Sequence, residues 1–188
     1  MGFSETTIQR NRDAVPISRA RSPDPSLLQS VVALLAKVAA LVLAAVLLVT
    51  FIYGIFRYGE PGMVPAVKDG DLVLFYRYSK GAYAPQDAVV LEFEGQRQVR
   101  RVVATAGDAV DITEEGLLVN GALQQELEIY QPTRRYAEGV EFPLTVPEGH
   151  VFVLGDARVN ATDSRVYGCV ATGDTLGKVM TILRRRGI

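Results

Sequence analysis

The sequence has 188 residues, which is enough for one membrane anchor and one modest domain. Its 20 Lys and Arg residues balance 21 Asp and Glu residues. This balance argues against nucleic acid as a partner, because phosphate binding requires a net basic surface. The single cysteine, Cys169, excludes an internal disulfide framework, and the single histidine, His150, has no partner histidine or cysteine cluster. We therefore expect no metal and no other cofactor, and we expect His150 to be a surface or half-buried residue in a loop.

The N-terminal part of the chain predicts a tail followed by a membrane anchor. Residues 1–25 are polar and rich in Ser, Arg and Pro, which is typical of a disordered cytoplasmic tail. Residues 26–57 are predicted to form the anchor helix, because 38–56 contain no charge and a helix of that length spans a hydrocarbon core of about 30 Å. A cleaved secretory signal fits less well, because the leader and the apolar run are both long.

The basic residues beside this run predict its orientation in the cell membrane. The excess lies upstream, at Arg10, Arg12, Arg19, Arg21 and Lys37, against Arg57, Lys68 and Arg77 downstream. An excess of Lys and Arg favours the cytoplasmic side. We expect a single-pass protein with a cytoplasmic N-terminus and an extracytoplasmic domain over residues 58–188.

Short β patterns replace the helical pattern after residue 59. The predicted strands are 72–78, 88–93, 98–105, 109–112, 150–154 and 175–183. Residues 117–121 end in Asn-Gly, the sequence of a tight hairpin turn. The sequence therefore predicts a mainly β, antiparallel domain of barrel or sandwich type after one helix.

Three blocks share the order and spacing of blocks in a known family. Residues 61–73 read PGMVPAVKDGDLV, 100–110 read RRVVATAGDAV and 155–165 read GDARVNATDSR. The first resembles the signal peptidase I box around its nucleophile, Ser-Met-x-Pro-Thr-Leu followed by Gly-Asp. The second resembles the lysine box, Lys-Arg-Val-x-Gly-x-Pro-Gly-Asp-x-Val, and the third resembles the Gly-Asp-Asn-Arg-x-x-Ser-x-Asp-Ser-Arg box. Segments 117–121, 146–150 and 176–178 also resemble the family, so the resemblance runs from the anchor to about residue 183.

The resemblance implies a mostly β fold at the outer membrane face, with a hydrophobic surface near an active site that uses a serine nucleophile and a neutral lysine base. This chain departs from that pattern. The serine position is Gly62, which has no side chain, and the lysine position is Arg100, which stays protonated. The serine that orients the lysine falls at Ala161, and the asparagine of the same box falls at Ala157. Glu60 replaces the residue that assists the oxyanion, which a carboxylate would repel.

Other positions match the family pattern and are implied to be framework residues. They are Met63, Pro65, Gly70, Asp71, Arg101, Gly107, Asp108, Gly155, Asp156, Arg158, Asp163, Ser164, Arg165 and Gly168. The resemblance implies an ion pair between Asp163 and Arg165. The pattern predicts a preserved scaffold around an emptied active site.

Three hypotheses follow. The first is a pseudoprotease that binds peptides or assists assembly. It resembles the inactive signal peptidase-like assembly factors of pilus gene clusters, whose partners would be pilins, sortases or secreted precursors. The second is a serine-type signal peptidase that cleaves secreted preproteins with altered chemistry, which requires a replacement dyad drawn from Ser164, Thr162, Lys68 and Lys80. The third is a decaying paralogue without a role.

Overall fold

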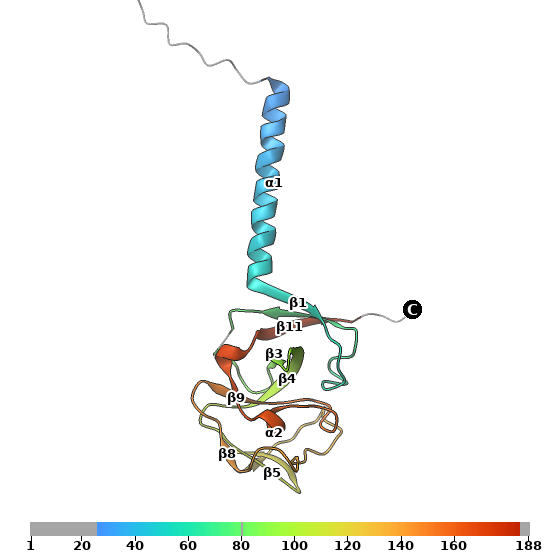
Figure 1. Ribbon diagram of the computed structural model, residues 1–188, viewed down its shortest axis with the longest axis vertical. Helices are drawn as coiled ribbons and strands as arrows, with labels where there is room; N and C mark the ends of the chain where they lie inside the picture. Colours follow the sequence, from blue (N-terminus) through green and yellow to red (C-terminus); the bar gives the residue numbers. More distant parts are fainter. Residues whose placement is uncertain (1–25, 80, 185–188) are drawn as a thin grey trace, which may run out of the picture. The chain divides into compact units, whose positions relative to one another are not determined.

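The computed structural model describes residues 26–79 and 81–184. The predicted tail at 1–25 lies outside the described residues. Helix α1 (Leu27–Ile52) has 26 residues and is long and apolar enough to cross a membrane. The predicted anchor helix is therefore present, but it ends earlier than expected (Figure 1).

The last part of the predicted anchor is a strand. Tyr53–Arg57 form β1, which pairs with β2 (Leu72–Tyr76) in antiparallel register. Its Tyr, Ile and Phe side chains suit a strand. Gly54 lies under the ring of Phe75, since a Cβ built at Gly54 would come within 2.1 Å of Phe75 Cζ. The helix therefore ends at Ile52 and not at the expected boundary, residue 57. The difference arises because the apolar strand β1 continues the apolar run of the helix.

The remaining chain forms two antiparallel sheets. The larger has seven strands in the order β1-β2-β11-β3-β4-β9-β10, and the smaller has four in the order β7-β6-β5-β8. Their other members are β3 (Ala88–Phe93), β4 (Gln96–Thr105), β5 (Ala109–Thr113), β6 (Gly116–Val119), β7 (Ala122–Leu123), β8 (Leu144–Thr145), β9 (His150–Leu154), β10 (Val170–Ala171) and β11 (Gly177–Leu183). Two short helices, α2 (Ser164–Tyr167) and the 3₁₀ helix η1 (Thr172–Asp174), complete the described fold.

This architecture confirms the mainly β, antiparallel prediction. Each predicted strand is present with its ends moved by at most a few residues, and the Asn-Gly turn has the positive φ angles of 52° and 78° at Asn120 and Gly121. The sequence did not predict the short strands β7, β8 and β10 or helix α2. His150 begins β9, as the predicted strand 150–154 has it, and is half-buried, so it lies at a strand end and not within a loop.

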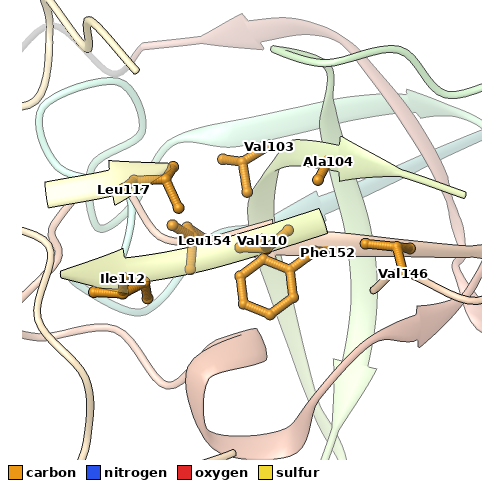
Figure 2. Close-up of a cluster of buried hydrophobic side chains, with 8 residues drawn as sticks. All are labelled: Val103, Ala104, Val110, Ile112, Leu117, Val146, Phe152 and Leu154. Carbon is orange, nitrogen blue, oxygen red and sulfur yellow. The ribbon is translucent and has the colours of Figure 1, made fainter. Parts of the chain in front are cut away.

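The two sheets are joined by a shared apolar core. Figure 2 shows eight buried side chains, of which seven come from β4, β5, β6 and β9 and the eighth is Val146. They are Val103, Ala104, Val110, Ile112, Leu117, Val146, Phe152 and Leu154. Alternate residues of β5 and β9 contribute to it because successive side chains point to opposite faces of a sheet, whereas Val103 and Ala104 are adjacent in β4, at the register shift opposite β9. The core fixes the smaller sheet against β4 and β9.

Strand β4 positions the site because it has two different neighbours. It pairs with β3 from Gln96 to Arg101 and with β9 from Arg101 onward. On the side facing β9, residues 96–100 therefore have no strand partner in the described structure. Arg100, which the resemblance assigns to the position of the family lysine, lies at the end of this unpaired stretch.

Candidate functional site

Gly62 and Arg100 meet, as the resemblance requires of a nucleophile and its base. Gly62 lies in the loop between β1 and β2, and Arg100 lies in β4. A Cβ built at Gly62 would come within 3.0 Å of Arg100 Nη1 and 3.3 Å of Cζ. The guanidinium therefore occupies the space beside the position where a serine side chain would begin.

Every N–H group of the buried Arg100 guanidinium has an acceptor. Nε and Nη2 donate to the Thr162 carbonyl at 2.9 and 2.8 Å, and Nη1 donates to the Val99 carbonyl at 2.6 Å. The remaining N–H groups pair with Glu60, through Nη1 to Oε1 and through Nη2 to Oε2 at 3.1 Å. Arg100 thus has no free donor for a ligand.

Glu60 joins Arg100 to a buried tyrosine. The Tyr58 hydroxyl donates to Glu60 Oε1 at 2.9 Å. Burial and then the charge of Glu60 raise the pKa of Tyr58 well above its usual range, so its hydroxyl stays a donor. Burial acts to lower the pKa of Arg100, but the hydrogen bonds and charge of Glu60 outweigh it and raise that pKa. The cluster of Tyr58, Glu60 and Arg100 is a closed ionic network.

The third block closes against the first block. The Ala157 N–H donates to the Gly62 carbonyl at 3.1 Å, and Ala157 and Ala161 are buried. A Cβ built at Gly155 would lie 2.2 Å from Ala161 Cβ and 2.5 Å from the Gly62 oxygen. The positions that the resemblance assigns to catalysis are therefore together in space, but without a hydroxyl or a neutral base.

Buried ion pairs hold the third block in place. Arg165 Nη2 lies 2.8 Å from Asp163 Oδ2, which is the expected pair, and Asp163 also accepts from the Gly155 N–H at 3.0 Å. Arg158 Nη2 lies 2.5 Å from Glu126 Oε1, and Arg158 also donates to Thr133. These contacts tie the segment before β8 to the loop that carries Ala161.

Other matching residues stabilise turns and strand ends. Arg101 pairs with Asp156 through Nη2 and Oδ2 at 2.6 Å, and the Asp156 N–H approaches Met63 Sδ at 3.4 Å. Asp108 accepts from the Thr105 N–H at 2.8 Å and from Asn120 at 2.8 Å. The backbone hydrogen bond from Thr105, followed by that from Asn120, lowers the pKa of Asp108.

A groove opens beside this cluster. It has a volume of about 670 Å³ and is lined by Phe56, Arg57, Gly59, Glu60, Glu92, Gly95, Gln96 and Arg97. One wall is β1, the edge strand of the larger sheet, and the other comes from the turn between β3 and β4 with the start of β4. Both walls carry strand edges without a strand partner in the described structure. Within residues 26–79 and 81–184, no three His, Cys, Asp or Glu side chains could hold a metal ion.

Comparison with known proteins places this geometry in a family. The family described as "Signal peptidase, peptidase S26" matches residues 31–183. The chain belongs to this family. It is 30% identical to a probable signal peptidase I-1 of Synechocystis over 154 residues, covering 75% of this chain and 76% of the relative. It is 29% identical to a signal peptidase I of Bacillus licheniformis over 135 residues, covering 66% of this chain and 72% of the relative. The crystal structure of a signal peptidase I from Enterococcus faecalis is 28% identical, with a TM-score of 0.44, and the match covers 53% of this chain and 97% of that one.

The structure describes three of the four candidates for a replacement dyad in this signal peptidase homologue. Ser164 is fully buried, and its Oγ accepts a hydrogen bond from the Val153 N–H at 3.0 Å. Lys68 is exposed on the loop between β1 and β2, and the Thr162 carbonyl is used by Arg100. Lys80 lies outside the described residues.

Three residues of the site were not identified from the sequence. Tyr58 is two positions before Glu60, and Tyr167 lies close enough to Arg100 for the guanidinium charge to act on the pKa of its hydroxyl. The Tyr167 hydroxyl is buried without a hydrogen-bond partner, and burial raises its pKa. Glu126 pairs with Arg158 across the fold. The spacing of Tyr58 and Glu60 is a usable signal, because alternate residues of an extended segment share a face, whereas nothing local indicates Glu126.

The surface of this signal peptidase homologue also has the apolar character that the resemblance implied. On β1, β2 and β11, Ile55, Leu72, Met180 and Leu183 are exposed. None of these three strands contains an Asp or Glu residue. These strands therefore expose apolar side chains together with the cations Arg57 and Lys178, and they carry no carboxylate.

Proposed function

We propose that this signal peptidase homologue is a non-catalytic pseudoprotease that binds an extended polypeptide at the outer membrane face. The observation that carries the proposal is the Glu60–Arg100 pair, which lies where a serine and a neutral lysine would have to act. Arg100 stays protonated and has no free donor, so it supplies neither a base nor an oxyanion contact. Gly62 supplies no nucleophile.

Peptide binding is supported by the groove between two strand edges. An extended segment that lies between β1 and the start of β4 could hydrogen-bond to the backbone of both walls by strand addition. Chemistry is not needed for this binding. A bulky side chain at Gly59, which has open space around its Cβ position, would block the groove.

The partners in this proposal are pilins, sortases or secreted precursor proteins, with an assembly role in pilus formation or secretion. The analogy with inactive signal peptidase-like assembly factors supports it. In situ cross-linking from position 59 tests it, because adducts with a pilin, sortase or precursor are expected. Adducts with none of these proteins would contradict the assembly role.

The lack of catalysis is tested with a purified preprotein. We expect the full chain in detergent to leave the preprotein intact at neutral pH, while an active signal peptidase I cleaves it in parallel. We also expect a fluorescent signal peptide to bind the chain, and Gly59→Trp to weaken this binding at least tenfold. Glu138→Trp, on an exposed site away from the groove, serves as the matched control.

The alternative is an active signal peptidase that cleaves signal peptides from secreted preproteins. It is favoured by the family match over residues 31–183 and by the preserved framework ion pairs. Cleavage that is abolished by Ser164→Ala or Lys68→Ala would establish this alternative. Cleavage that survives substitution of all four candidates, Ser164, Thr162, Lys68 and Lys80, would point to a contaminating peptidase.

A further inference from the structure

Three basic residues from separate elements meet on the loop between β1 and β2. Arg184, which follows β11, donates from Nη2 to the Pro65 and Ala66 carbonyls at 3.3 and 3.1 Å. Arg57 ends β1, and a Cβ built at Gly70 would lie 3.4 Å from its Nη2. Lys68 lies on the loop itself and is exposed. We call Arg57, Lys68 and Arg184 the basic corner.

The basic corner has little acidic compensation. Asp71 is buried, and its carboxylate accepts the Lys68 N–H at 3.0 Å, so it is turned into the fold. Asp69 is the exposed carboxylate of the loop, whereas Glu60 is paired with Arg100. The three cations form no ion pair in the described structure. The sequence then continues with two further arginines, Arg185 and Arg186.

Apolar side chains lie directly beside these cations. Arg57 is opposite Leu72 in the β1–β2 register, and Leu72 is opposite Leu183 in the β2–β11 register. Leu72 and Leu183 are 40% and 53% exposed. A surface that presents cations next to exposed leucines suits a bilayer surface, where phosphate groups lie above acyl chains.

Chain continuity keeps the corner close to the end of the helix. Strand β1 begins at Tyr53, directly after the last residue of α1, Ile52. Five extended residues span at most about 17 Å, so Arg57 remains near the lipid headgroups when α1 crosses a bilayer. Lys68 and Arg184 lie on the elements next to it in the fold.

We infer that the basic corner binds the phosphate groups of anionic lipids and thereby holds the loop that carries Gly62 at the bilayer surface. The occupant is an anionic leaflet, because separate cations beside exposed leucines match many phosphates above acyl chains better than one small anion. This inference requires α1 to cross the membrane. It does not depend on peptide binding or on the absence of catalysis.

The test uses the full chain in nanodiscs of phosphatidylcholine alone or with a one-third share of phosphatidylglycerol. Amide hydrogen exchange is measured over residues 59–71. The anionic lipid should slow exchange in this loop by roughly tenfold, and high salt should remove the effect, as expected for a few cations near a charged surface. Equal exchange in both kinds of nanodisc would overturn the inference.

Charge-matched variants identify the corner. Arg57→Gln with Lys68→Gln should abolish the lipid-dependent protection, and Arg184→Gln should reduce it. Arg134→Gln with Arg135→Gln removes the same charge from a different segment and should leave the protection intact. The inference fails if this control pair abolishes protection equally, because general surface charge would then explain it. It also fails if inorganic phosphate with neutral nanodiscs reproduces the protection, because the corner would then be a small-anion site. Exchange in the core strands β4 and β9 reports whether each variant remains folded.

Discussion

At the scale of single residues, Gly62 and Arg100, which the resemblance assigns to the serine and lysine positions, are coupled to a third residue, Glu60. A buried guanidinium requires a partner, because an unpaired buried charge costs several kcal/mol. Glu60 supplies this partner from a position 40 residues away in sequence. The three positions therefore form one structural unit.

The Glu60–Arg100 pair should be strongly non-additive. Glu60→Ala leaves the buried Arg100 unpaired and should lower the free energy of unfolding by about 3 kcal/mol. The double variant Glu60→Ala with Arg100→Met removes both charges and should recover much of that loss. Urea unfolding of the full chain in detergent measures both. Arg135→Ala breaks an exposed ion pair with Asp111 and should cost less than about 1 kcal/mol. Additive losses in the double variant would contradict the coupling.

Restoring the two family residues should not restore proteolysis. In Gly62→Ser with Arg100→Lys, the Glu60 carboxylate would keep the new lysine charged, and Ala161 offers no hydroxyl to orient it. We expect no preprotein cleavage above background from this variant. Adding Glu60→Ser and Ala161→Ser is the informative extension. Cleavage that appears only in this fourfold variant would show that Glu60 and Ala161 prevent catalysis in the double variant. Efficient cleavage by the first double variant would refute this explanation.

The sequence predicted much of the site by position but not its contacts. Gly62, Arg100, Ala157 and Ala161 were identified because their blocks keep the family spacing, and the structure brings them together. The pairing of Glu60 with Arg100 was not foreseen, because it depends on which side chains fill the space above Gly62. Strand β1 was assigned to the anchor because its apolar residues continue the membrane run without a charge. Contacts between distant segments and boundaries inside an apolar run are not local properties of a sequence.

At the scale of elements, the first and third blocks form a close backbone contact at Gly155. Gly155→Ala would place a Cβ 2.2 Å from Ala161 Cβ and 2.5 Å from the Gly62 oxygen. We expect it to lower the free energy of unfolding by about 2 kcal/mol or more, since a tightly packed contact must move. Thermal unfolding measures the loss. Gly59→Ala, where nothing lies within 4 Å, should change stability by less than about 0.5 kcal/mol. Equal effects of the two substitutions would contradict the close contact.

The turn before β5 should make stability depend on acid. Hydrogen bonds from Thr105 and Asn120 lower the pKa of Asp108 below its ordinary value in the folded chain. A carboxyl with a lowered folded pKa adds stability above its unfolded pKa, and this contribution is lost as pH falls through the folded pKa. Asp108→Asn should therefore be less stable than the parent near pH 6, and the difference should shrink below about pH 4. Urea midpoints across this range test it, and a constant difference would argue against the titration.

At the scale of the whole molecule, a single apolar helix precedes a β domain, and the flanking cations predict which side the domain occupies. A C-terminal alkaline phosphatase fusion should be active outside the cytoplasm, and a green fluorescent protein fusion at the same point should remain dark. Neutralising Arg10, Arg12, Arg19, Arg21 and Lys37 should produce mixed orientations. A bright fluorescent fusion of the parent chain would reverse the predicted topology.

The direct passage from Ile52 to Tyr53 has a kinetic consequence. Since no spacer residues separate α1 from β1, the domain cannot sample a large volume of solvent as a tethered receptor would. When α1 crosses a bilayer, Phe56 and Arg57 of the groove lie within five extended residues, at most about 17 Å, of the end of the helix. Encounters with other anchored proteins then become a lateral search in two dimensions, which favours partners whose exposed segment begins within a few residues of their own membrane span.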